Sequence, residues 1–219
     1  MPSTPPSPRW PVVVFDLDGT LVDTIGLIVA SYQHAFTTVL GRQEDEVMIR
    51  SWIGQPLIRG FRSIDPEHAD ELLSTYLAWN RANTERLIGR YAGIDTLLAD
   101  LTAAGVGVAA ATSKLRGPAE DAVRLSGLAA YLDVLVTMED TDAHKPDPAP
   151  LLLAVERLGA PPGDAVYVGD AVVDVQAARN AGMAAVGVTW GAGTRDAVVT
   201  AEPDVLVDTV DELRAALLG

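Results

Sequence analysis

Two aspartates that follow an apolar segment are the residues of this chain most suited to chemistry. Asp16 and Asp18 come directly after Val12-Val13-Val14-Phe15, whose β-branched, apolar residues predict a buried strand. Side chains alternate along an extended chain, so these two carboxylates point the same way. Gly19 then allows a sharp turn. Because adjacent carboxylates repel unless a cation or a proton intervenes, the pair favours a metal or acid–base site over an ordinary surface turn.

A second acidic pair follows the apolar segment Ala165 to Val168, which also predicts a strand. Asp170 comes after Gly169, and Asp174 lies four residues further on, in the first turn of a predicted helix. Acids are common at helix starts because the helix dipole favours them, so a structural role explains Asp174 equally well. The position of Asp170 after a glycine at a strand end favours a metal ligand.

Polar groups also follow two other predicted strands. Thr112 and Ser113 offer a hydroxyl and backbone N–H groups that could hold an oxyanion, or else cap a helix. Lys145, held in a loop stiffened by Pro146 and Pro148, is either a fixed positive charge or a solvated loop lysine. Carboxylate ligands without His or Cys point to Mg²⁺, and Mg²⁺ beside a lysine and N–H donors is suited to a phosphoryl group.

These side chains meet only if their strands end at one edge of a sheet. Apolar segments alternate with helical ones, which predicts an α/β fold, a Rossmann-like parallel sheet flanked by helices. Ligands bind at the carboxyl ends of such strands. The predicted strands after the first cover Val106 to Ala111, Val134 to Val136, Ala165 to Val168, Ala184 to Val188 and Val205 to Val207. The predicted helices cover Ile94 to Ala104, Pro118 to Leu125, Pro148 to Leu158, Val172 to Ala181 and Val210 to Leu218.

The segment after the first strand breaks this alternation. Helical patterns cover Ile25 to Leu40, Glu44 to Trp52 and Pro66 to Ile88, with no strand among them. So long an insertion exceeds a plain crossover and predicts a lid over the strand ends. We therefore expect a disordered tail at residues 1–9, a catalytic core at 10–22 and 91–219, and a helical cap at 23–90.

Composition limits the partners. The chain has 219 residues, no cysteine and a formal net charge of −14, which repels nucleic acids and anionic membranes. No apolar run is long enough to cross a bilayer, and we expect a cytoplasmic monomer or homodimer. A phosphate site must then be locally positive. The chain has two lysines, Lys114 and Lys145, and both follow predicted strand ends.

The ordered set of motifs resembles the haloacid dehalogenase superfamily of phosphohydrolases. The matching stretches are Asp16 to Thr20 (DLDGT), Thr112-Ser113, Lys145-Pro146 and Gly169 to Asp174 (GDxxxD), in that family's order. The resemblance covers nearly the whole chain beyond the tail. It implies a phosphatase whose small helical cap is inserted after the first motif.

The resemblance also implies roles for the catalytic residues. Asp16 would attack phosphorus and form an aspartyl-phosphate, and Asp18 would protonate the leaving oxygen and then activate water. Thr112 and the Ser113 backbone would bind phosphoryl oxygens, with Gly19 among the substrate-binding residues. Lys145 would steady Asp16 and the phosphate charge.

For the metal, the resemblance implies Mg²⁺ held by the Asp16 carboxylate, the Asp18 backbone carbonyl and Asp170. Asp174 would act from the outer shell or through water.

Other branches of the superfamily fit less well. Dehalogenases lack the acid at Asp18, mutases carry a histidine where this chain has Ile28, and the phosphonate-cleaving branch needs a cap lysine that is absent here. The remaining similarity is to phosphoglycolate phosphatases, so we expect a small phosphorylated substrate, phosphoglycolate first. Inorganic pyrophosphate is the alternative that the stretch Ile53 to Leu57 (IGQPL) favours, and a phosphate-binding protein without catalysis is an alternative of another class.

Three arginines of the cap are candidates for holding a remote anionic group of the substrate. They are Arg50, Arg59 and Arg62. Arginines on helices more often face solvent.

Overall fold

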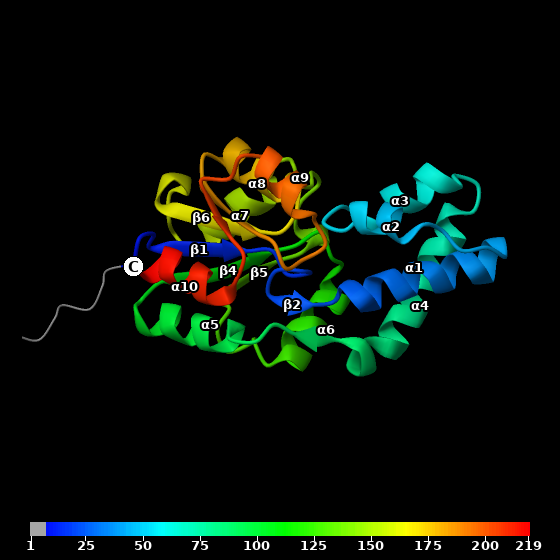
Figure 1. The fold of residues 1–219 in the computed structure, drawn as a ribbon, viewed down its shortest axis with the longest axis horizontal. Helices are drawn as coiled ribbons and strands as arrows, with labels where there is room; N and C mark the ends of the chain where they lie inside the picture. The colour runs from blue at the N-terminus through cyan, green and yellow to red at the C-terminus, as the bar shows by residue number, and fades with distance from the viewer. Residues whose placement is uncertain (1–7) are drawn as a thin grey trace, which may run out of the picture.

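The computed structural model describes residues 8–219, and its centre is a six-stranded parallel sheet (Figure 1). The strand order is β5-β4-β1-β6-β7-β8, so the strand that precedes Asp16 lies in the middle. Val13 of β1 pairs with Val108 on one side and with Val166 on the other. The strands are β1 (Val12–Phe15), β4 (Gly107–Ala111), β5 (Val134–Val136), β6 (Ala165–Gly169), β7 (Ala184–Val188) and β8 (Val205–Val207).

Helices cover both faces of this sheet, so the central strands β1 and β6 are buried along their whole length. Val13 and Phe15 face a core with α5 and α10, whereas Val12 and Val14 face a core with α7 and α8. Figure 1 shows these two helical layers above and below the sheet. The predicted α/β fold class is therefore confirmed. The helices are α5 (Ile94–Ala103), α6 (Arg116–Ser126), α7 (Ala149–Arg157), α8 (Val172–Ala181), α9 (Arg195–Thr200) and α10 (Val210–Leu218), with short 3₁₀ turns at Met138–Asp140 and Pro162–Asp164.

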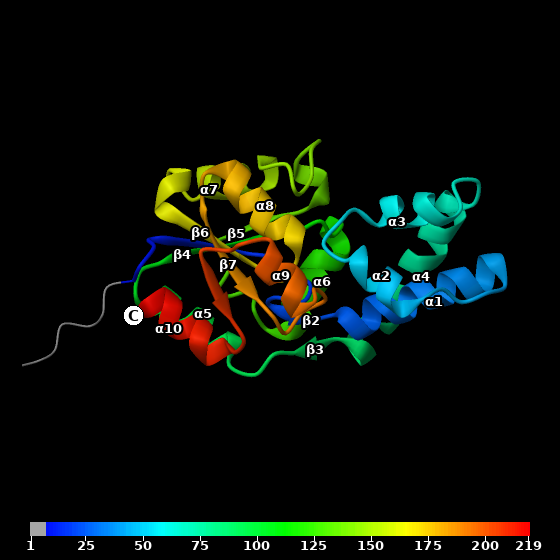
Figure 2. The same ribbon diagram turned by 45° about the horizontal axis from the view of Figure 1, so that its top comes forward.

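Four helices form a separate unit beyond one end of the sheet (Figures 1 and 2). The chain enters this unit through β2 (Val22–Asp23) and leaves it through β3 (Gly89–Arg90). These two short strands pair antiparallel. We call this unit the cap. Its helices are α1 (Ile25–Leu40), α2 (Glu46–Ser51), α3 (Leu57–Ile64) and α4 (Ala69–Leu87).

The cap has its own hydrophobic core of aromatic rings. The ring of Tyr32 lies 4.8 Å from that of Phe61 and 4.9 Å from that of Tyr76, measured between centroids. Helix α3, which the sequence did not predict, brings Phe61 into this cluster. Gly60 on the same helix lets it approach the Trp52 ring, which a Cβ at that position would crowd at 3.0 Å.

Seven of the fourteen predicted elements have the observed bounds, and the other seven differ by one to three residues at an end. The ladder β2-β3, helix α3 and helix α9 are additions to the prediction. Residues 1–7 of the expected tail lie outside the described residues. The backbone N–H of Arg9, also within the expected tail, donates to the Leu217 carbonyl at 3.0 Å, so Arg9 is held against α10. Within residues 8–219, no helix combines the length and apolar character that crossing a bilayer requires.

Candidate active site

Asp16 lies at the carboxyl end of β1 and is buried beside a lysine. Its backbone N–H donates to the Val168 carbonyl at 2.8 Å, which fixes its position against β6. Nζ of Lys145 lies 2.9 Å from Oδ1 of Asp16 and 2.7 Å from Oδ1 of Asp174. The lysine also donates to the Tyr167 hydroxyl at 2.9 Å. The expected fixed positive charge therefore sits between two carboxylates, rather than in a solvated loop.

Lys145 is only 1 % exposed, so its charge depends on these neighbours. Burial opposes the charged form, but Asp16 and Asp174 outweigh it and raise the pKa of Lys145 well above its usual range. The Tyr167 hydroxyl, which accepts from the lysine, in turn donates to the Ala111 carbonyl at 2.8 Å. Lys145 is thus a charged ammonium held at a fixed point under the site.

Three carboxylates gather around this lysine. One oxygen from each of Asp16, Asp170 and Asp174 lies within 4.8 Å of the others, and all three residues are buried. Burial raises the pKa of Asp16 well above its usual range, and the charges of Asp174 and Asp170 add to that effect. Burial, with the charge of Asp174, also raises the pKa of Asp170 to about 6. One lysine does not balance three acids, so the cluster favours a further cation or protons.

Asp170 is held in place by contacts from two other segments. The Thr20 hydroxyl donates to its Oδ1 at 3.0 Å, and the backbone N–H of Ala192 donates to its Oδ2 at 2.7 Å. Gly191 lies so close to this carboxylate that a Cβ there would collide with it. The loop after β7 therefore fixes the orientation of Asp170.

The donor set fits Mg²⁺. Oδ1 of Asp16 is buried and accepts no hydrogen bond from the described residues, although the Lys145 ammonium lies near it. A buried carboxylate oxygen without a hydrogen bond, next to two further carboxylates, is suited to a hard divalent cation. All three residues offer an oxygen to the cluster. Both oxygens of Asp170 also accept hydrogen bonds, from Thr20 and the Ala192 N–H, and both oxygens of Asp174 accept them from Lys145 and the Ala171 N–H.

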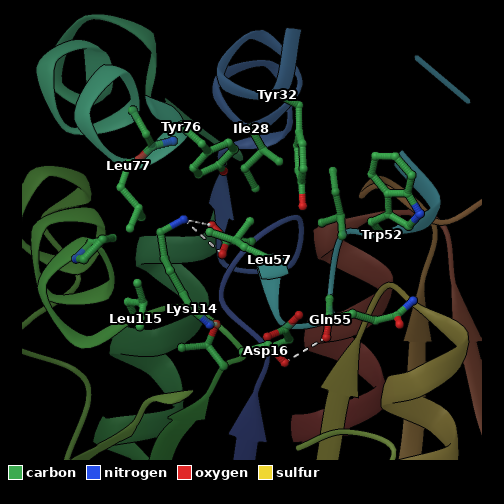
Figure 3. A pocket seen from close by; sticks show the side chains of 17 residues that line it. Asp16, Ile28, Tyr32, Trp52, Gln55, Leu57, Tyr76, Leu77, Lys114 and Leu115 are labelled. Atoms are coloured by element: carbon green, nitrogen blue, oxygen red, sulfur yellow. Dashed lines mark hydrogen bonds and ion pairs between the residues drawn. The ribbon is translucent and has the colours of Figure 1, made fainter. Parts of the chain in front are cut away.

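The Asp18 carboxylate lies apart from this acidic cluster. The Thr24 hydroxyl donates to its Oδ1 at 2.6 Å, and Nζ of Lys114 lies 2.9 and 3.1 Å from its two oxygens (Figure 3). Asp16 and Asp18, whose carboxylates the sequence predicts to point the same way, are thus divided between two lysines. Asp16 contacts Lys145, and Asp18 contacts Lys114.

A pocket opens above Asp16 and Asp18, between the sheet edge and the cap (Figure 3). Thr112 and Ser113 line it. The Ser113 hydroxyl donates to the Gly54 carbonyl of the cap at 2.8 Å, so this side chain joins the two parts of the molecule. The backbone N–H of Gly19 donates to the Val22 carbonyl at 2.9 Å, and its φ of +84° serves the turn into β2. Gly19 therefore shapes the site without offering that N–H to a substrate.

The three cap arginines do not line this pocket. Arg50 pairs with Glu46 on its own helix at 2.9 Å, and Arg59 and Arg62 flank the buried Phe61 on α3. That arrangement turns Arg59 and Arg62 away from the aromatic core of the cap. The structure does not place these arginines where the sequence interpretation expected them.

Several residues of the site are not assigned to it by the sequence. The sequence singles out Lys114 only because it follows a strand, and it gives no contact for Thr20, Thr24 or Tyr167. Tyr167 does carry a signal, because it is a polar-tipped residue in a strand otherwise made of small and apolar ones. The contacts of Thr20 and Thr24 depend on the turn geometry after Asp18, which the sequence does not specify.

Comparison with known proteins supports this arrangement of motifs. Residues 13–188 match the family model of haloacid dehalogenase-like hydrolases. The chain belongs to the haloacid dehalogenase-like hydrolase family. The pyrophosphatase PpaX of Bacillus velezensis is 37% identical over 94% of this chain and 95% of its own length. PpaX of Bacillus pumilus is 32% identical over 93% and 94%.

Solved structures show the same fold. A predicted phosphatase from Clostridium acetobutylicum is 28% identical, with a TM-score of 0.85 over 94% of this chain and 97% of its own. A protein from Bacteroides fragilis, named as haloacid dehalogenase-like, is 26% identical, with a TM-score of 0.87 over 94% and 100%. The chain is therefore a hydrolase of the phosphatase type.

Proposed function

We propose that this protein is a Mg²⁺-dependent hydrolase of inorganic pyrophosphate. The observation that carries the proposal is the meeting of Asp16, Lys145, Asp170 and Asp174 at one sheet edge, beneath a pocket that also contains Asp18. The arrangement brings together a candidate nucleophile, carboxylates that would hold a metal ion and a candidate general acid. Pyrophosphate takes precedence over phosphoglycolate because relatives at 32 to 37% identity are named pyrophosphatases. The bond cleaved is then an anhydride and not a monoester.

Asp16 is positioned to act as the nucleophile. One carboxylate oxygen attacks phosphorus from the sheet side, and the bond from phosphorus to the bridging oxygen breaks. Lys145 beneath it stabilises the ionised carboxylate and the phosphoryl charge. Asp16 and Asp170 would hold Mg²⁺, and the bound ion would supply positive charge that offsets the charge of the phosphoryl oxygens.

Asp18 is positioned to move the proton. In its protonated form it gives a proton to the bridging oxygen as orthophosphate leaves. As a carboxylate it then takes a proton from the water that attacks the phosphoryl group on Asp16, which restores the free nucleophile. Thr24 and Lys114 hold this side chain at the pocket wall while it does so. Thr112 and Ser113 line the same pocket, and we assign contacts with the phosphoryl oxygens to the Thr112 side chain and the Ser113 backbone.

The proposal is tested by turnover. We expect the wild-type protein to release orthophosphate from pyrophosphate when Mg²⁺ is present and not when it is chelated. Phosphoglycolate and p-nitrophenyl phosphate serve as comparison substrates. Asp16→Asn keeps the size of the side chain but removes the nucleophile, and it should lower kcat by about 10³-fold or more.

Two outcomes would contradict the proposal. A higher kcat/KM for phosphoglycolate than for pyrophosphate would return the assignment to a monoesterase. Equal, negligible rates for wild type and Asp16→Asn on every substrate would favour a phosphate-binding protein without catalysis. The variant's circular dichroism and melting temperature establish that a lost rate is not a lost fold.

A further inference from the structure

The pocket above Asp16 has an uneven distribution of charge. Among the described residues that line it, Lys114 is the one that carries a positive charge. The cap contributes apolar or neutral side chains to the lining, including Tyr32, Trp52 and Leu57 (Figure 3). Asn80 of the cap also lines it. An anionic group that enters this pocket beyond the scissile phosphate therefore has one cation within it to contact.

Lys114 is also held at the point where a leaving group must lie. Its ammonium contacts both oxygens of Asp18, at 2.9 and 3.1 Å. An acid that protonates the leaving oxygen has to be within hydrogen-bond distance of it. The group attached to that oxygen then lies beside Asp18, and therefore beside Lys114.

The ammonium has a donor to spare. A lysine ammonium carries three N–H groups, and the two hydrogen bonds found here both go to Asp18. The apolar residues Leu77, Leu115 and Pro118 line the pocket together with Lys114. The Lys114 side chain is 10% exposed, so one face of it remains open to the pocket.

We infer that Lys114 is the specificity-determining residue that binds the second phosphate of pyrophosphate, the leaving group. This inference rests on the proposed function and assigns to Lys114 the role that the sequence suggested for the cap arginines. A charge-assisted hydrogen bond in a partly buried site corresponds to about 10- to 100-fold in affinity. Substrates whose leaving group has no charge of its own gain little from it.

Binding of two non-reacting ligands tests this directly. Methylenediphosphonate has two phosphoryl groups and is not hydrolysed, whereas orthophosphate has one. Their dissociation constants are measured by calorimetry at saturating Mg²⁺ in wild type, Lys114→Gln and Arg81→Gln. Arg81 is exposed on α4 and does not line the pocket, so its variant controls for the loss of one positive charge.

We expect wild type and Arg81→Gln to bind the diphosphonate more tightly than orthophosphate. Lys114→Gln should weaken diphosphonate binding by about tenfold or more and orthophosphate binding by less than about threefold. Equal weakening of both ligands, or no weakening, would overturn the inference, because a lysine that only orients Asp18 does not distinguish them. A wild type without preference for the diphosphonate would overturn it too.

Two further measurements separate the possible failures. If Lys114→Gln melts far below wild type, ligand binding is compared between Asp18→Asn and Asp18→Asn/Lys114→Gln. Neither of these two variants has a carboxylate at position 18 that could lose its lysine partner. A wild type that fails to hydrolyse pyrophosphate would reject the proposed function, while Lys114-dependent binding of the diphosphonate would still support the inference about this residue.

Discussion

The hydroxyl of Ser113 donates a 2.8 Å hydrogen bond to the carbonyl of Gly54, and this bond joins the catalytic edge of the sheet to the cap. Gly54 has a φ of +91°, which glycine adopts without strain. Ser113, which directly follows the predicted phosphate-binding residue Thr112, therefore also holds the cap loop at Gly54. We infer that the position of the cap and the geometry of the phosphate site are connected here.

Removal of this hydroxyl should loosen the cap. For Ser113→Ala we expect faster backbone hydrogen exchange in residues 52–57, since a bond contributing about 1 kcal/mol is lost. Exchange in the sheet should stay unchanged and serves as the internal control. Unchanged exchange in residues 52–57 would show that the bond does not hold the cap.

Replacement of Lys145 should destabilise the fold. In Lys145→Met the buried carboxylates of Asp16 and Asp174 lose their cation, so we expect about 3–5 kcal/mol less unfolding free energy in urea at neutral pH without Mg²⁺. A second substitution, Asp174→Asn, should recover part of this loss because it removes one of the uncompensated charges. A loss below about 1 kcal/mol would contradict the strong coupling that we assign to these groups.

Without Mg²⁺, stability should fall as pH rises through about 6. Burial raises the pKa of Asp170 from its ordinary value of 3.8 to about 6, so the folded protein binds this proton more tightly than the unfolded chain does. The stabilisation is thus present below about pH 4 and is lost as pH rises through about 6, by up to about 3 kcal/mol. In Asp170→Asn this decrease should be smaller, as melting temperatures between about pH 5 and 7.5 would show. A similar decrease in both proteins would assign it to other groups.

Addition of Mg²⁺ at neutral pH should raise the melting temperature of the wild-type protein. A cation that binds the folded state alone stabilises it, and the buried acids repel one another without it. Asp16→Asn should show a much smaller shift, since it replaces one carboxylate of the cluster. An equal shift in both would place the bound cation elsewhere.

Gly191→Ala should weaken Mg²⁺ binding without unfolding the protein. The added methyl group collides with the Asp170 carboxylate and displaces it from the Ala192 N–H. We expect about tenfold or more Mg²⁺ to reach half of the stabilising effect. Gly117→Ala on α6 is the matched control, because a Cβ there contacts nothing within 4 Å. Identical Mg²⁺ titrations of the two variants would contradict the role given to the loop.

The residues around Asp16 were predictable because parallel strands bring their carboxyl ends to one edge. That rule alone placed Asp16, Lys145, Asp170 and the Thr112-Ser113 pair together, although it said nothing of their distances. Helix α3 was missed because it has only 8 residues and includes Gly60, yet Gly60 is what lets it pack on Trp52.

The side-chain pairings of the site and the directions of the cap arginines could not be predicted in the same way. Asp16 pairs with one lysine and Asp18 with the other because of how the loops after β1 and β4 turn. The pattern of apolar and polar residues does not specify the course of these loops. Arg59 and Arg62 were expected to bind an anionic group of the substrate. Phe61, which lies between them in the sequence, is buried in the cap. A buried aromatic residue on a short helix directs its neighbours outward.

Both lysines of the chain lie beside the carboxylates of the site, and arginine supplies every other basic side chain apart from the histidines. Reagents that acylate lysine side-chain amines therefore have no lysine target elsewhere in the chain. The extent of such labelling, followed by mass spectrometry, becomes a footprint of the pocket itself. A ligand that occupies the pocket should protect Lys114, and Lys145 should react only when the sheet edge around it opens.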